Sequence, residues 1–125
     1  MKKKLILEWS QYVEYTFDNV QKYAPNDAGV YKIGFVQNDG KLRVCYVGQA
    51  QDIDTRLKQH LNLDNEQNEC LRERLKKYKS EFSFAKVATQ ENRNGVERAL
   101  YYHYTPTCND PDAIPNGPEI DVNLK

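Results

Sequence analysis

The sequence predicts an α+β fold in which helices surround a small three-stranded antiparallel β-sheet. Residues 29–36 and 41–48 are rich in β-branched and aromatic side chains, and Asn38-Asp39-Gly40 between them supplies turn residues, so together they predict a β-hairpin. Residues 82–87 alternate apolar and polar side chains, which predicts the third strand. Elsewhere apolar residues recur every three or four positions, as they do on amphipathic helices.

One predicted helix precedes the hairpin in the sequence, and another follows it. Residues 8–23 place apolar side chains at positions 9, 13, 17 and 20, on one stripe of a helix that packs on the core. Ala24-Pro25-Asn26-Asp27 then ends this helix before the first strand. Residues 53–61 repeat an apolar side chain every four positions, and Arg56 and His60 are also four apart, so they share one face of that helix.

Two further helices lie before and after the third strand. Residues 66–78 have apolar side chains at positions 71, 75 and 78, with Asn65 as the expected N-cap. Residues 94–104 form the last predicted helix, with Asn94 as the expected N-cap. The prolines and the glycine of residues 110–125 interrupt regular structure beyond it, so this segment either packs in extended form or is disordered.

Length and composition are those of one globular domain. The chain has 125 residues, of which 39% are hydrophobic and 29% charged, and this composition excludes a disordered chain. The longest apolar run, residues 5–7, is too short for a membrane span or a secretory signal, so we expect no membrane partner. We expect residues 1–109 to form a single domain, with its core over about 28–109, followed by an acidic, proline-rich tail at residues 110–125.

Charge is balanced over the whole chain but not along it. Eighteen basic and eighteen acidic residues give zero net charge, whereas nucleic-acid-binding proteins normally carry a basic excess for their phosphate contacts. Residues 110–125 hold four acidic residues against one lysine, so the first 109 residues carry a net charge of +3. A modestly basic body therefore precedes an acidic tail.

The three cysteines, Cys45, Cys70 and Cys108, are far apart in the sequence. Their number is odd, and no pair has the spacing of a metal site or of a redox motif. We therefore expect three free thiols and a protein of the reducing cytoplasm.

Two tripeptides on the predicted hairpin carry the functional signal. They are Gly29-Val30-Tyr31 on its first strand and Tyr46-Val47-Gly48 on its second. Arg56 follows the second tyrosine by ten residues, and His60 lies four residues further on. This arrangement resembles the GIY-YIG nuclease family, whose signature tripeptides, helix arginine and second helix position have the same spacing.

The resemblance continues into the last predicted helix and covers about residues 28–109. Glu97 matches the family's metal-binding glutamate, and Asn109, twelve residues later, matches its asparagine. The resemblance implies a metal-dependent DNA endonuclease that hydrolyses phosphodiester bonds, with Mg²⁺ or Mn²⁺ held by Glu97. DNA repair and restriction are the pathways that such an activity suggests.

The matched residues also suit this chemistry in physical terms. Arg56 can present a rigid fork of donors to phosphoryl oxygens. Tyr46 is the expected acceptor of a proton from the attacking water, and because a free phenol has a pKa of about 10, nearby cations must lower it or His60 must share the task. We expect Tyr31 and His60 to orient the reacting groups or to relay the proton. Asn109 is expected to fix the geometry around Glu97 or Tyr46.

Substrate contacts are expected from four side chains. Many family members have lysine directly after the second tripeptide, where this chain has Gln49, which can donate a hydrogen bond but carries no charge. Five basic residues within positions 72–79 form either a DNA-facing patch or a solvated helix face that complements the helix dipole. The expected DNA contacts are Gln49, Arg56, Arg72 and Lys76.

Two other functions are compatible with the sequence. A non-catalytic nucleic-acid-binding or interaction module could use the same scaffold. In a protein that has lost nuclease activity, however, the matched tyrosine, arginine, carboxylate and asparagine should be the first residues to be replaced, and all of them are present in this chain. A nuclease module directed to its target by a protein partner would account for the zero net charge.

Overall fold

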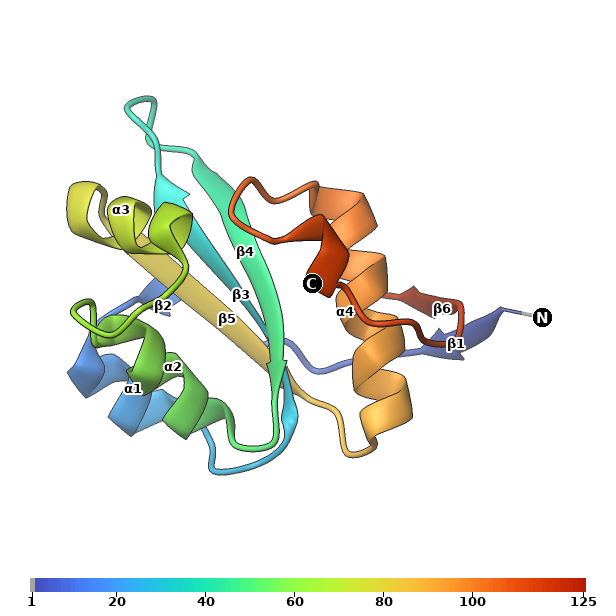
Figure 1. Cartoon of the computed structure of the whole chain (residues 1–125). Helices are drawn as coiled ribbons and strands as arrows, with labels where there is room; N and C mark the ends of the chain where they lie inside the picture. Colours follow the sequence, from blue (N-terminus) through green and yellow to red (C-terminus); the bar gives the residue numbers. More distant parts are fainter. Residues whose placement is uncertain (1) are drawn as a thin grey trace.

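A four-stranded antiparallel β-sheet forms the centre of the fold. The computed structural model of the chain describes residues 2–125, and the strands lie in the order β2-β5-β3-β4 (Figure 1). They comprise Val13–Glu14 (β2), Gly29–Val36 (β3), Leu42–Ala50 (β4) and Ser80–Lys86 (β5). Every residue of β3 from Gly29 to Phe35 is buried. A strand buried on both faces requires a covering layer on each side of its sheet.

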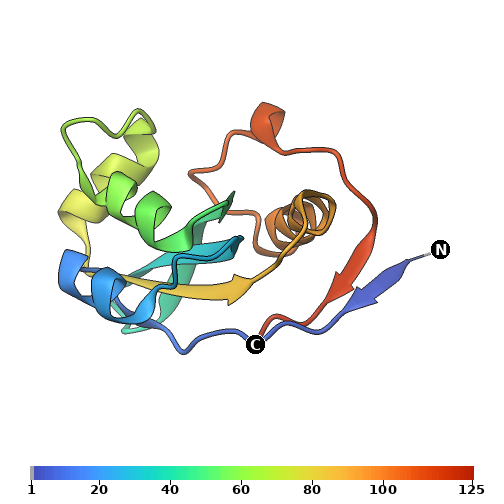
Figure 2. The same cartoon turned by 90° about the horizontal axis from the view of Figure 1, so that it is seen from below.

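Helices supply both layers. Those on one face are α1 (Phe17–Tyr23), α2 (Ile53–Leu61) and α3 (Glu69–Lys77), and α4 (Gln90–Tyr104) lies on the other (Figures 1 and 2). Alternation along β3 separates two cores, because Tyr31 and Ile33 pack with the first three helices whereas Val30 packs with α4. None of the helices within residues 2–125 is long and apolar enough to cross a membrane.

The predicted α+β class and the central hairpin are confirmed. β3 pairs antiparallel with β4, from Gly29 opposite Ala50 to Val36 opposite Leu42. Gly40 in the connecting turn has a φ of 83°, a conformation that glycine adopts without steric cost. The predicted third strand corresponds to β5, which pairs with the other side of β3.

The prediction of three strands is incomplete, and the prediction of a helix over residues 8–23 is wrong in its first half. Val13–Glu14 forms the extra strand β2, which pairs with β5. The helix begins only at Phe17, because the Thr16 hydroxyl caps it by accepting the Asn19 N–H at 3.1 Å. Apolar residues at positions 13 and 15 also fit the two-residue period of a strand, and pairing with β5 decides between the two periods.

Two later helices begin at residues other than those expected. α3 is capped by Asn68 rather than Asn65, and α4 by Thr89 rather than Asn94. In each case the capping side chain accepts an N–H from the first turn, as Asn68 does from Leu71 at 3.0 Å. Several residues of capping type precede each helix, so the sequence alone does not single out the one that caps.

The two ends of the chain pair with each other. β1 (Lys3–Leu5) runs parallel to β6 (Ile120–Val122), forming a second, two-stranded sheet. The Asn123 side chain accepts the Leu7 N–H at 2.6 Å and donates to the Leu7 carbonyl at 2.8 Å. Residues 111–113 form a 3-10 helix, and Ile120 is buried in the α4 core. The segment expected as a tail therefore packs against the domain.

Lys32 is buried beneath this C-terminal segment. Its Nζ lies 4.1 Å from the centre of the Trp9 ring and donates to the Leu124 carbonyl at 2.8 Å. Burial lowers the pKa of Lys32 to about 8. The amine is stabilised in the core by the face of an aromatic ring and a backbone carbonyl, and it joins β3 to the last residues of the chain.

The expectation of three free thiols is wrong. Cys70 on α3 forms a disulfide with Cys108, which follows α4, whereas Cys45 is free and buried. The paired cysteines are 38 residues apart in the sequence, and folding brings them together because the segment after α4 returns to α3. The Asn68 side chain donates to the Cys108 carbonyl at 2.7 Å in the same region.

Reduction of the disulfide should destabilise the protein. A cross-link between Cys70 and Cys108 closes a loop of intermediate length, for which the expected contribution to the free energy of unfolding is about 2–4 kcal/mol. Denaturant unfolding with and without reductant measures this difference, and Cys70→Ser should show no further loss on reduction. Alkylation of the unfolded, non-reduced protein should modify only Cys45, and modification of all three cysteines would refute the disulfide.

Candidate active site

The residues matched in the sequence meet at the outer edge of β4, the last strand of the sheet. Tyr46 faces the layer that contains α2, and Gln49 faces α4. Figure 1 shows β4 between these two helices. Because α2 carries Arg56 and His60 while α4 carries Glu97, side chains from both faces of the sheet converge around one strand edge.

The glycines of the two tripeptides allow close packing at this edge. A Cβ atom on Gly48 would lie 2.5 Å from the hydroxyl oxygen of Tyr31, whose ring crosses β4 at that point. A Cβ atom on Gly29 would overlap the carbonyl oxygen of Ala85 on β5. Gly48 is therefore required for the position of the Tyr31 hydroxyl, and Gly29 for the approach of β3 to its neighbour.

A chain of buried hydrogen bonds runs from β3 to the loop after α2. The Tyr31 hydroxyl lies 2.8 Å from His60 Nε2, and His60 Nδ1 lies 2.6 Å from a carboxylate oxygen of Glu66. Tyr31 and His60 are each only 1% exposed. Burial raises the pKa of Tyr31 well above its ordinary value and lowers the pKa of His60, which the Glu66 carboxylate partly restores. Both rings are therefore neutral near pH 7.

Arg56 lies beside both tyrosine hydroxyls. Its guanidinium is within hydrogen-bonding reach of Tyr31 and Tyr46, and Nη1 donates to Gln59 at 3.1 Å. Burial raises the pKa of Tyr46, and Arg56 lowers it in part. Arg56 is half-buried and borders a cavity of about 440 Å³, whose other walls are Gln59, Asn62, Asn65, Glu66 and Gln67. A cation that borders a cavity in this way can bind an anionic substrate.

Glu97 is a buried carboxylate with little compensation. It is 8% exposed, and burial raises its pKa to about 6, while a hydrogen bond from Gln49 acts in the opposite direction. None of the ion pairs within residues 2–125 includes Glu97. A carboxylate that is removed from water without a cationic partner is destabilised in its charged form, and a bound metal ion would relieve that cost.

Asn109 closes the edge of β4. Its Oδ1 accepts the Val47 N–H at 2.9 Å, and its Nδ2 donates to the Val47 carbonyl at 2.8 Å. The neighbouring Cys108 N–H donates to the Cys45 carbonyl at 2.9 Å. The amide thus acts as a one-residue strand partner for β4 and fixes the backbone next to Tyr46.

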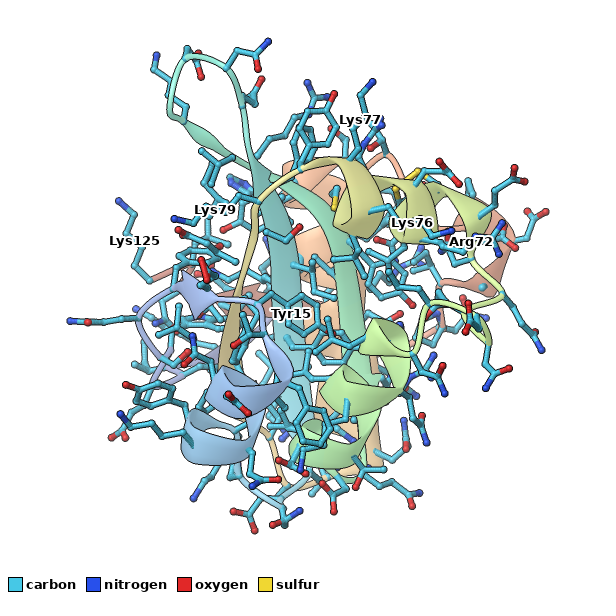
Figure 3. The ribbon with its side chains drawn as sticks, turned by 90° about the vertical axis from the view of Figure 1, so that its left-hand side faces the viewer. Tyr15, Arg72, Lys76, Lys77, Lys79 and Lys125 are labelled. Carbon is cyan, nitrogen blue, oxygen red and sulfur yellow. A yellow bond between two sulfur atoms is a disulfide. The ribbon has the colours of Figure 1, made fainter. Side chains whose placement is uncertain are left out.

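The expected DNA-contacting residues divide into two groups. Gln49 accepts from Gln90 at 2.5 Å and donates to Asn94 at 2.8 Å, so it lies in the site beside Glu97 and α4. Arg72 and Lys76 lie outside it on α3 (Figure 3). Arg72 donates from Nη1 to the Glu66 carbonyl at 3.0 Å, whereas Lys76 is exposed.

Comparison with known proteins assigns the family. The profile of the GIY-YIG catalytic domain matches residues 28–110, about two thirds of the chain. The chain belongs to the GIY-YIG family. A comparison with curated protein sequences found no match.

Solved structures of GIY-YIG domains have the same fold. The N-terminal endonuclease domain of UvrC from Thermotoga maritima, bound to its catalytic magnesium ion, is 25% identical, with a TM-score of 0.54. The alignment covers 74% of this chain and 98% of that domain. A tyrosine-to-phenylalanine variant of the same domain, bound to its catalytic divalent cation, matches with the same identity and TM-score, over 74% of this chain and 97% of that one.

Glu66 is a member of the site that sequence reasoning missed. The resemblance to the GIY-YIG family names no residue at this position, and the apolar period of residues 66–78 predicts that Glu66 begins a helix. It lies instead in the loop between α2 and α3, where its carboxylate contacts His60. The six-residue separation from His60 matches no periodicity, so only the path of the loop brings the two together.

Loss of the Asn109 side chain should expose the β4 edge. Asn109→Ala removes the side-chain oxygen that accepts the Val47 N–H, and opening of that amide should become easier because an unpaired buried group costs about 1–3 kcal/mol. Hydrogen exchange of Val47 should accelerate about 10- to 100-fold, while amides within the β3–β5 pairing keep their protection. Asn109→Asp, which retains the acceptor, should preserve protection; equal acceleration in both variants would contradict the role of Oδ1.

Proposed function

We propose that this protein is a divalent-metal-dependent endonuclease that hydrolyses phosphodiester bonds in DNA. One observation carries the proposal: a tyrosine–histidine pair, an arginine and an uncompensated carboxylate converge at one strand edge. Hydrolysis of a phosphodiester needs an acceptor for the proton of water, donors for the phosphoryl oxygens and a centre of positive charge. Membership of the GIY-YIG family and similarity to the UvrC endonuclease domain support the assignment.

Glu97 is the residue that would hold the metal ion. Its carboxylate is an oxygen donor of the kind that Mg²⁺ and Mn²⁺ prefer, and in this proposal it is the single protein ligand of the ion. Mg²⁺ tolerates such sites because it retains water ligands and accepts substrate oxygens. When bound, the ion supplies positive charge to the phosphoryl and leaving oxygens. Gln49 orients the carboxylate through its hydrogen bond.

The proton of the attacking water passes to Tyr31 and His60 in this proposal. Tyr31 already lies 2.8 Å from His60 Nε2, a neutral base, so its hydroxyl can receive one proton while it releases another. This exchange avoids an isolated phenolate, which the burial of Tyr31 disfavours. The sequence favours Tyr46 for this role, whereas the hydrogen bond to His60 makes Tyr31 the acceptor in this proposal. Tyr46 instead shares Arg56 with Tyr31 and contributes to phosphate binding.

Arg56 donates to the phosphoryl oxygens, and α3 extends the contact with DNA. The guanidinium borders an open polar cavity, from which it can reach a phosphate on the surface. Lys76 and Lys77 are exposed on α3, and Figure 3 shows them on the same helix as Arg72. Because Arg72 already supports Glu66, its contribution to DNA binding is combined with a structural one.

Two observations bear on the alternative functions. A non-catalytic scaffold has no use for a buried carboxylate with a raised pKa, so Glu97 argues against that alternative. The zero net charge of the chain favours a nuclease that receives part of its DNA affinity from a targeting partner. The catalytic proposal is the same with or without such a partner.

Glu97→Gln should abolish cleavage without harming the fold. Since burial raises the Glu97 pKa from its ordinary value to about 6, the metal-free protein loses stability as pH rises from about 4.5 to 6, and the variant lacks this loss. Its Tm at pH 7 should therefore equal or exceed that of the wild type. Mn²⁺ affinity of the wild type, measured by titration calorimetry, should fall below about pH 6, because protons then compete for the carboxylate.

The control for this experiment is Glu91→Gln. Glu91 is exposed in the first turn of the same helix, so the substitution makes the same chemical change outside the site. Cleavage of supercoiled, branched and single-stranded DNA should be unchanged in this control. Normal cleavage and Mn²⁺ binding by Glu97→Gln would remove Glu97 from the metal site.

Phenylalanine substitutions should separate the two tyrosines. Tyr31→Phe removes the hydroxyl that donates to His60, and single-turnover cleavage should fall about 10²–10⁴-fold with DNA affinity nearly unchanged. Tyr46→Phe should cost less, about tenfold. Arg56→Ala should lower both turnover and affinity, and it should reduce the salt dependence of binding by about one phosphate contact.

The reverse ranking of the tyrosines would overturn the proton assignment. Near-normal cleavage by Tyr31→Phe, together with an inactive Tyr46→Phe, would return the role of proton acceptor to Tyr46. Binding and cleavage must be measured on the same DNA at several salt concentrations, so that lost affinity is not mistaken for lost chemistry.

A further inference from the structure

Glu66 is held in place more firmly than a loop carboxylate usually is. One of its carboxylate oxygens lies 2.6 Å from His60 Nδ1, and the other accepts the Asn68 N–H at 3.1 Å. Its carbonyl accepts from Arg72 at 3.0 Å, and its side chain is only 9% exposed. Both ends of the residue are therefore fixed before any substrate binds.

These contacts determine the direction of the hydrogen bonds around His60. A carboxylate can only accept, so the short contact with Glu66 requires the proton of the neutral imidazole to be on Nδ1. The lone pair is then on Nε2, and the Tyr31 hydroxyl must donate to it. The hydrogen bonds therefore run in one direction, from the Tyr31 hydroxyl through His60 to the Glu66 carboxylate.

We infer that Glu66 is a positioning residue that fixes the tautomer of His60 and thereby makes Nε2 the proton acceptor for Tyr31. The inference rests on the proposed nuclease function, since it explains how the tyrosine–histidine pair becomes competent to take a proton. The logic is that of an orienting acid behind a catalytic histidine. Glu66 touches neither substrate nor metal in this role.

Without the carboxylate, the opposite tautomer becomes available. An imidazole with its proton on Nε2 would donate to the Tyr31 oxygen, and no base would remain to receive the tyrosine proton. Among residues 2–125, the other polar groups that face His60 are Tyr31 from β3, Tyr46 from β4 and Arg56 from its own helix, and none of them is acidic in the way that Glu66 is. The tautomer of His60 should therefore depend on this single carboxylate.

The tautomer can be read directly by NMR. The chain has two histidines, and the exposed His103 provides an internal reference for the ¹⁵N shifts of His60. The wild type should carry the His60 proton on Nδ1 at neutral pH, and Glu66→Ala should move it to Nε2. A proton on Nε2 in the wild type, or one that stays on Nδ1 in Glu66→Ala, would overturn the inference.

Glu66→Gln and Asp64→Asn complete the comparison. The glutamine keeps an acceptor for Nδ1–H but loses the charge, so it should retain most of the Nδ1 tautomer and lower the pKa of His60 in an NMR titration. Asp64, exposed in the same loop, provides a control that should match the wild type in tautomer and titration. A His60 pKa unchanged in Glu66→Gln would contradict the proposed contact, even if Glu66→Ala failed to fold.

Cleavage kinetics add a functional readout. Single-turnover cleavage by Glu66→Ala should fall about 10- to 100-fold, the usual cost of losing an orienting partner, whereas Glu66→Gln should be less impaired and Asp64→Asn normal. Full activity in Glu66→Ala would show that the tautomer has no catalytic consequence. If the wild type cleaves no DNA, the proposed function fails, whereas the NMR measurements still decide whether Glu66 sets the tautomer.

Discussion

The burial of β3 on both faces is the constraint on which the rest of the structure depends. A strand covered on both sides alternates its side chains between two separate cores, so Tyr31 points toward α2 and Val30 toward α4. Residues on opposite faces of a sheet cannot meet through it. They can meet only around an edge, and β4 is the edge strand next to β3. The position of the candidate site therefore follows from the strand order.

Burial also determines what the ionisable groups can do. At the site, burial destabilises the charged form of Glu97. It also keeps Tyr31 and His60 neutral while a hydrogen bond joins them. On the opposite side of β3 the same effect lowers the pKa of Lys32, which is stabilised by the Trp9 ring instead of a substrate. The two groups differ in their partners. Lys32 is stabilised by contacts within the chain, whereas Glu97 receives a hydrogen bond but forms no ion pair within residues 2–125.

The sequence predicts the parts of the fold that depend on local pattern. The hairpin, the helix with Arg56 and His60 and the last helix follow from turn residues and apolar periods, and the family follows from two tripeptides at the right spacing. The extra strand β2 is not predictable in this way, because the apolar residues of 8–16 fit both the helical and the strand period. Pairing with β5 determines that residues 13–14 form a strand. The disulfide and Glu66 are contacts between segments whose approach depends on the complete fold.

The geometry beside Tyr46 depends on a segment that is remote in sequence. Asn109 pairs with Val47, and its position follows from the contacts of the preceding residue. Cys108 is bonded to Cys70 on α3, and its N–H donates to Cys45 on β4. The disulfide therefore anchors the residue next to the amide that closes the strand edge. The Asn109 side chain makes only two hydrogen bonds with β4, and it can replace a strand only where its backbone is already fixed; the covalent link to α3 meets that requirement.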